Sequence, residues 1–291
     1  MLATTKRDPT WLRKKAPDPS VLLYIKSLLD ELGLHSICES AECPNQGECF
    51  AEGTVTFLVL GNVCTRNCRF CAVTKGIPQA PDEQEPKKIA EAVKRLGLTY
   101  VVITSVTRDD LPDNGANHFS KIVREVNSAS PLTIVELLIS DLQGSTQAIT
   151  DITNSLPQVI NHNIETVPRL YPAVRPKAHY QRSLEVLHTI KSINSSIVTK
   201  SGLMLGMGED RHELLQVLVD LRKVDCDLIT LGQYFPPSKS HYPLSRFVTP
   251  GEFEEIKHIA LDIGFRGVLS GPFVRSSYNA YQLFQEAYHT E

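Results

Sequence analysis

Short apolar runs alternate along most of this chain with segments in which apolar residues recur every three or four positions. A run of four to eight apolar residues predicts a buried strand, whereas the three-to-four spacing predicts a helix with one buried face. The runs predict strands at residues 57–61, 100–104, 133–139, 158–161, 196–205, 227–231 and 267–269. The pattern therefore gives six strand–helix units followed by a seventh short strand.

The helical spacing is clearest in four of the segments between these strands. Gly97 and Gly264 are placed to end two of the predicted helices, since glycine favours the left-handed conformation of a helix C-terminus. Residues 249–252, Thr-Pro-Gly-Glu, are typical of a capping box with proline in the first turn. The predicted buried positions are Ile89, Val93, Leu96, Phe119, Ile122, Val123, Val126, Leu214, Val217, Leu218, Leu221, Ile256, Ile259, Ala260 and Ile263.

Alternating strand–helix units imply a parallel sheet covered by helices, an α/β fold. Six units suit a partial (β/α)6 TIM-like barrel with extensions at both ends. We expect an N-terminal extension at residues 1–55, the barrel at 56–265 and a C-terminal extension at 266–291. Within the first extension, residues 20–32 predict an amphipathic helix that buries Val21, Leu22, Ile25, Leu28 and Leu29.

Composition and charge narrow the class of protein. The 291 residues are 42% hydrophobic and 22% charged, which is ordinary for a globular protein. A net charge of −3 gives no reason to expect nucleic acid as a partner. No apolar run approaches the ~18 residues that a membrane span needs, and the N-terminus lacks the apolar core of a secretory signal. We therefore expect a cytoplasmic protein, or the mature form of an organelle protein.

Six of the seven cysteines fall between Cys38 and Cys71, and the seventh is Cys226. Clustered cysteines in an intracellular chain favour metal binding over a disulfide framework. Cys226 is expected to be a small buried apolar residue. His162 and His241 are expected to be structural, although each could also be a metal ligand.

Cys64, Cys68 and Cys71 follow the spacing C-x3-C-x2-C, directly after the first predicted strand. Thiolates favour an iron–sulfur cluster or zinc over magnesium or calcium. A four-iron cluster takes four ligands, so three cysteines leave one iron open to a small molecule. In α/β barrels the active site lies at the carboxyl ends of the strands, and this cysteine run follows the end of a predicted strand. A zinc knuckle is the alternative, although the spacing is uncommon for one.

Cys38, Cys43 and Cys49 form a second triad with the spacing C-x4-C-x5-C. Pro44, Asn45 and Gly47 disfavour a continuous helix there and favour a tight loop. Three further thiols in twelve residues predict a second metal site.

Phe70, just before the last cysteine of the C-x3-C-x2-C run, strengthens a resemblance to the radical S-adenosylmethionine (SAM) superfamily. The two triads together with Arg-Ser-Ser-Tyr at residues 275–278 closely resemble the lipoyl synthase family. This resemblance covers the chain from about residue 9 onwards. It implies a partial barrel, two [4Fe–4S] clusters, bound SAM, and insertion of two sulfur atoms into an octanoyl chain carried on a lysine.

The resemblance also implies roles for individual residues. Cys64, Cys68 and Cys71 would hold the cluster that passes an electron to SAM, yielding a radical that removes hydrogen from an unactivated C–H bond. Cys38, Cys43, Cys49 and Ser277, with Ser276 as the runner-up, would hold the auxiliary cluster that donates sulfur. Phe70, Ser105, Asn163 and Glu165 would contact SAM, and Arg175 would pair with its carboxylate. The plainer alternative for these polar residues is a loop hydrogen bond or a helix cap.

The partners implied by the resemblance are an octanoylated lipoyl carrier domain or H protein, and a reductant such as ferredoxin or flavodoxin. The chain is expected to be a monomer that binds neither nucleic acid nor membrane. Two alternatives remain open. One is a different radical SAM enzyme with an auxiliary cluster, such as one that inserts sulfur into another substrate. The other is a zinc- or cluster-binding module without catalysis, which the six strand–helix units disfavour.

Overall fold

Seven parallel strands, in the order in which they occur in the chain, form the main sheet of the computed structural model, which describes residues 9–12, 19–41, 43, 45–51 and 54–288. A short strand, β1 (His35–Ser36), pairs antiparallel with the first of them. Every one of the seven overlaps a predicted strand. They are β2 (Thr56–Val59), β5 (Tyr100–Ser105), β6 (Ile134–Leu138), β7 (Val159–Asn161), β8 (Val198–Leu205), β9 (Leu228–Gln233) and β10 (Gly267–Gly271).

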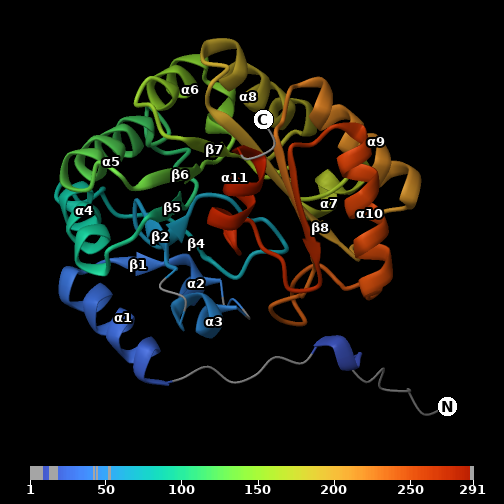
Figure 1. Cartoon of the computed structure of the whole chain (residues 1–291), viewed down its shortest axis with the longest axis horizontal. Coiled ribbons are helices and arrows are strands. Elements are labelled where there is room, and N and C mark those ends of the chain that lie inside the picture. The colour runs from blue at the N-terminus through green and yellow to red at the C-terminus, as the bar shows by residue number, and fades with distance from the viewer. Residues whose placement is uncertain (1–8, 13–18, 42, 44, 52–53, 289–291) are drawn as a thin grey trace.

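A long helix follows each of the first six parallel strands and covers the outer face of the sheet. Figure 1 shows these helices as an arc around the strands. Over the described residues the sheet does not close, because β1 and β10 are its two edges. The predicted partial (β/α)6 fold is therefore confirmed. The helices are α4 (Glu85–Leu96), α5 (Ala116–Ala129), α6 (Thr146–Thr153), α8 (Tyr180–Ile193), α9 (Arg211–Lys223) and α10 (Pro250–Ile263).

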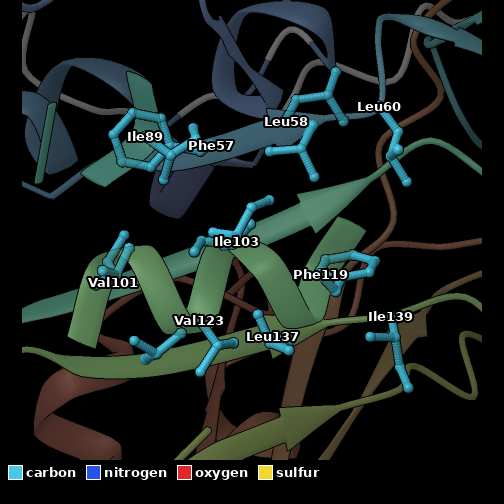
Figure 2. Packing of buried hydrophobic residues seen from close by; sticks show 14 of the residues in the cluster. Phe57, Leu58, Leu60, Ile89, Val101, Ile103, Phe119, Val123, Leu137 and Ile139 are labelled. Atoms are coloured by element: carbon cyan, nitrogen blue, oxygen red, sulfur yellow. The ribbon is translucent and has the colours of Figure 1, made fainter. Parts of the chain in front are cut away.

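Helix α5 shows why the spacing of apolar residues predicted these helices well. Its four predicted core residues, Phe119, Ile122, Val123 and Val126, are completely buried. Figure 2 shows Phe119 and Val123 among side chains from the neighbouring strands. Burying one such side chain contributes about 1.5–3 kcal/mol, so this face fixes the helix against the sheet.

Helix α10 begins and ends as predicted. The Thr249 hydroxyl accepts a hydrogen bond from the Glu252 amide, and the Glu252 carboxylate accepts one from the Thr249 amide. Gly264 ends the helix at a φ of +106°, which an L side chain rarely adopts. Ile259 and Ile263, predicted to face the core, are only half-buried.

The N-terminal segment carries helix α1 (Pro19–Leu32), as predicted, with Ile25, Leu28 and Leu29 buried. The side chains of Val21 and Leu22, predicted on the same face, lie outside what the structure describes. As predicted, the first cysteine triad does not lie on one continuous helix, since Cys43 belongs to no helix. The tight loop predicted around it is flanked by two short helices that were not predicted, α2 (Ile37–Ser40) with Cys38 and α3 (Gln46–Ala51) with Cys49. The Ser36 hydroxyl starts α2 by accepting a hydrogen bond from the Cys38 amide. Pro44 is outside the described residues.

The C-terminal helix α11 (Ala280–Tyr288) lies against the ends of the strands where they begin. Tyr281 and Phe284 pack on the ring of Tyr100, the first residue of β5, with centroid separations of 5.6 and 5.9 Å. Strand β10 is part of the main sheet, so the C-terminal extension expected from residue 266 starts within the sheet. The division of the chain at residues 55 and 265 stays a prediction.

A fully buried ion pair lies between the strands. Lys200 of β8 is 2.9 and 3.0 Å from the two carboxylate oxygens of Glu136 on β6. The Tyr100 hydroxyl and the Asn161 amide also donate to this carboxylate. A buried charge is stable only when it is paired and hydrogen-bonded, so the pair fixes the relative positions of four strands.

Replacing Glu136 with glutamine should destabilise the chain by about 3–5 kcal/mol, because it leaves the Lys200 charge buried without a carboxylate. Denaturant unfolding of the full chain measures this loss. The matched control is Glu31→Gln, which breaks an exposed pair with Arg95 and should change stability far less, because solvent screens surface ion pairs. Equal losses in the two variants would contradict the assigned role of the buried pair.

Candidate functional site

A cavity of about 720 Å³ opens where the parallel strands end. Segments from both ends of the chain and from most of the strand ends contribute to its wall. Because parallel strands present their carboxyl ends at one edge, side chains far apart in sequence meet there. The predicted site residues that line it are Cys38, Cys43, Cys64, Cys68, Phe70, Cys71, Ser105, Asn163, Glu165, Arg175, Ser276 and Ser277.

The loop that carries Cys64, Cys68 and Cys71 leaves β2 through Leu60, whose φ of +65° turns the chain towards the cavity. The loop begins in strand β3 (Val63–Cys64), which pairs with β4 (Thr74–Lys75) just after the last cysteine. The Arg66 amide lies 3.4 Å from the Cys64 sulfur, to which it donates a hydrogen bond. Contacts within the protein therefore hold this loop in shape.

Burial disfavours ionisation of two thiols in this loop, those of Cys68 and Cys71. It raises the pKa of Cys71 to about 12 and also raises the pKa of Cys68, although the nearby Arg175 charge acts in the opposite direction at Cys68. Among the described residues, no group of three histidine, cysteine, aspartate or glutamate side chains forms a site for a single metal ion. The thiols of the loop line one cavity wall, and such sulfur donors favour an iron–sulfur cluster.

Two carboxylates hold the side chain of Arg66, between the first two cysteines of the loop. The guanidinium lies 2.7 Å from Asp109 and 2.6 Å from Asp141. Burial acts to raise the pKa of Asp141, but the hydrogen bond and charge of Arg66 outweigh it and lower this pKa to about 2. This group of charged side chains was not predicted from the sequence. The available signal was an arginine inside the cysteine motif and an aspartate after the second strand.

The first cysteine triad lies beside the C-terminal segment. The side-chain amide of Asn45 donates a hydrogen bond of 2.6 Å to the Phe273 carbonyl, and the Tyr278 hydroxyl donates one of 2.8 Å to Glu48. Cys38 and Cys43 line the cavity, and Cys49 of α3 is buried. The fold therefore brings the Arg-Ser-Ser-Tyr segment to this triad, as the resemblance implied.

The two neighbouring serines of that segment have different surroundings. The Ser276 hydroxyl exchanges hydrogen bonds with the side chain of Asn163, at 2.7 and 2.9 Å. Ser277 also lines the cavity. Gly202 of β8 makes room for this contact, because a Cβ there would lie 2.6 Å from Asn163 and 2.9 Å from Ser276.

Three of the residues expected to contact SAM, Ser105, Asn163 and Glu165, lie at or just after the ends of β5 and β7, and Phe70 lies in the cysteine loop. Asn163 donates to Glu165, whose φ of +66° is uncommon for a side chain other than glycine. Burial raises the pKa of Glu165, against the lowering effect of Arg175. Arg175, after α7 (Tyr171–Val174), donates to the carbonyls of residues 163 and 164. Its buried Nε has no hydrogen-bond partner among the described residues.

The two histidines lie near the site but in hydrogen bonds of their own. His162 is fully buried; its Nδ1 donates to the Ile139 carbonyl and its Nε2 accepts from Ser183, since a carbonyl can only accept. His241 contacts the Cys71 carbonyl and Ser238. Cys226 is completely buried, as expected for a small apolar residue.

Burial, followed by the charge of Arg175, lowers the pKa of His162 to about 4. Between pH ~6.5 and about 4, this histidine is protonated in the unfolded chain but not in the folded chain. The free energy of unfolding therefore falls as the pH drops through this range. At pH 5 this histidine should account for a loss of about 2 kcal/mol relative to pH 7.5.

Denaturant unfolding of the metal-free chain at both pH values measures this loss, and His162→Gln should remove it. The remaining histidines are common to both proteins and cancel in the comparison. An identical change in stability between the two pH values in both proteins would contradict the assignment to His162.

Comparison with known proteins supplies the family. Residues 58–221 match the family model described as the radical SAM superfamily. A curated lipoyl synthase from Caldicellulosiruptor saccharolyticus is 52% identical over 280 residues, covering 96% of this chain and 98% of that protein. The lipoyl synthase of Geobacter sulfurreducens is 53% identical over 274 residues, covering 94% of this chain and 90% of that protein.

Solved structures share the fold at low sequence identity. Methylornithine synthase superposes with a TM-score of 0.58 at 13% identity, covering 90% of this chain and 80% of that one. The FeFe-hydrogenase maturase HydG from Carboxydothermus hydrogenoformans gives 0.60 at 14%, covering 92% and 69%. These likenesses concern the fold alone.

Proposed function

From the premise that this chain belongs to the lipoyl synthase family of radical SAM enzymes, we propose which of its residues carry the reaction. The protein is a sulfurtransferase that inserts two sulfur atoms into a protein-bound octanoyl group. It uses two [4Fe–4S] clusters and SAM. The observation that supports the residue assignment best is that members of both cysteine triads border one cavity.

The residues around the cavity suit these groups chemically. Soft thiols lie on the wall at two places, as two iron–sulfur clusters require. The buried Arg175 Nε, with no hydrogen-bond partner among the described residues, suits a carboxylate such as that of SAM. When bound, the SAM cluster supplies the electron that splits SAM into methionine and a 5′-deoxyadenosyl radical, a reaction beyond amino acid side chains.

Cys64, Cys68 and Cys71 would hold the SAM cluster, and Phe70 would lie against the bound SAM. Asn163 and Glu165 would hold its polar groups, with Ser105 at the end of β5 as a further contact. The hydrogen bond between Asn163 and Glu165 supports this role, because it sets the orientation of both side chains before SAM binds.

Cys38, Cys43, Cys49 and Ser277 would hold the auxiliary cluster, which serves as the substrate that gives up sulfur. Ser276 is the runner-up, but its hydroxyl is already engaged with Asn163. A serine oxygen is a poorer ligand for cluster iron than a thiolate. A weakly held iron suits a cluster that is taken apart in the reaction.

We propose the substrate and the electron donor of this enzyme from its family membership. The octanoylated partner would be a lipoyl carrier domain or H protein, and the electron would come from ferredoxin or flavodoxin. None of the seven cysteines, all of which the structure describes, forms a disulfide, which suits the reducing cytoplasm that we propose for this enzyme. None of the described helices has the length and apolar character of a membrane span. We propose that it acts as a monomer and binds neither nucleic acid nor membrane.

The experiment that tests the proposal supplies the anaerobically reconstituted enzyme with SAM, a reductant and an octanoylated carrier domain, and follows lipoyl formation by mass spectrometry. A radical SAM enzyme with a different substrate would cleave SAM but leave the octanoyl group unchanged. A cluster-binding module would not cleave SAM.

Metal analysis of the reconstituted protein should give roughly eight irons per chain with matching sulfide, the sum of two four-iron clusters. Replacing Cys38, Cys43 and Cys49 together with alanine should lower the iron to roughly four and keep SAM cleavage. Zinc with almost no sulfide in the parent protein would contradict the radical mechanism.

Ser277→Cys should leave SAM cleavage near that of the parent and lower lipoyl formation by roughly tenfold or more, because a thiolate holds the fourth iron more firmly. The matched control is Ser276→Ala, which removes the hydroxyl bonded to Asn163 and should raise the KM for SAM instead. Unchanged lipoyl formation in Ser277→Cys would count against Ser277 as the ligand.

A further inference from the structure

We propose that Asp141 is a positioning residue for the radical SAM reaction, acting through Arg66 on the loop of Cys64, Cys68 and Cys71. This inference rests on the proposed assignment of that loop to the SAM cluster. Within residues 64–71, all of which the structure describes, Arg66 alone is buried. Its side chain is 4% exposed, although it lies in the sequence between two proposed cluster ligands.

The two carboxylates that hold Arg66 come from different strand ends. Asp109, in the loop after β5, accepts from Nε and Nη2 at 2.7 and 2.8 Å. Asp141, after β6, accepts from Nη2 at 2.6 Å. A planar guanidinium forked between two carboxylates admits one orientation, whereas a lysine at the same place could rotate freely.

Asp141 is itself fixed in the fold. It is completely buried, its Oδ1 accepts a hydrogen bond from the Gln143 amide, and its Oδ2 lies 3.5 Å from Arg182 of α8. The carboxylate therefore has its position set by the end of β6 and by a neighbouring helix. It transmits that position to the cysteine loop through a single side chain.

Stability alone is a weak reason for this arrangement. The free-energy cost of removing two or more charges from water is about as large as the gain from their mutual attraction. Apolar residues of similar size would therefore hold a loop equally well. The charged group of Arg66, Asp109 and Asp141 additionally fixes the orientation of the Arg66 side chain. The group also borders the cavity, where Arg66 and Asp141 are both part of the wall.

The main chain at Arg66 connects this charged group to a proposed cluster ligand. The Arg66 amide donates a hydrogen bond to the Cys64 sulfur at 3.4 Å, and the adjacent Thr65 amide is bonded to the Thr107 carbonyl at 3.1 Å. Fixing the Arg66 side chain fixes the peptide that carries this N–H. Hydrogen bonds to ligand sulfurs are among the factors that set the reduction potential of a cluster.

The test compares Asp141→Asn, which keeps the shape and one acceptor, with Arg66→Lys, which keeps the charge but loses the fork. Both full-length enzymes are reconstituted anaerobically. The measurements are kcat and KM for SAM cleavage, the electron paramagnetic resonance signal of the reduced SAM cluster, and the melting temperature. Asp82→Ala, which breaks an exposed pair with Lys88, is the control for loss of an aspartate.

We expect kcat for SAM cleavage to fall roughly tenfold or more in each variant with the KM for SAM changed less than about twofold, and the cluster signal to change shape. The Arg66→Lys/Asp141→Asn double variant should lose no more than the worse single variant, since both act through one contact. Asp82→Ala should match the parent.

The inference is overturned if Asp141→Asn keeps the parent kcat and cluster signal, or if the two single losses simply add. It is also overturned if iron content and melting temperature fall in proportion to kcat, since that is general destabilisation. A parent enzyme that binds no cluster at Cys64, Cys68 and Cys71 would instead refute the proposed function, and the parent measurements reveal this before any variant is made.

Discussion

The parallel alignment of seven strands in chain order is the constraint on which the site depends. Because all seven run the same way, every strand end delivers its following segment to one edge of the sheet. Cys64, Ser105 and Asn163 reach the cavity by this route, each from a different strand. The buried pair of Glu136 and Lys200 ties β6 to β8, the strands on either side of β7, so the edge is rigid where the ligands must converge.

Much of the fold could be predicted because its signals are local. The four buried residues of α5 repeat at helical spacing, and Thr249 with Glu252 starts α10 through contacts three residues apart. The helices α2 and α3 escaped prediction because each is too short for a periodic apolar face. Helix α2 starts where the Ser36 hydroxyl accepts a hydrogen bond from the Cys38 amide, and the residues around Ser36 predict no helix.

The site could be predicted only for residues that belong to a short, characteristically spaced sequence motif. The cysteine triads are short patterns, and their chemistry follows from residue type. An arginine such as Arg66 is usually exposed, and its partner Asp141 lies 75 residues away, so no local pattern joins them. Adjacent serines are equivalent in a sequence. The contact between Ser276 and Asn163, 113 residues apart, is what distinguishes Ser276 from Ser277.

The contact between Asn45 and Phe273 joins segments 228 residues apart, with the first cysteine triad near one end and the serine pair near the other. A ribosome adding about 5–20 residues per second needs roughly 10–50 seconds to make the intervening chain. During that interval the early thiols exist without the late serine. The proposed sulfur-donor site is therefore a property of the finished polypeptide, and a chain released early has the cysteines without the pocket that completes them.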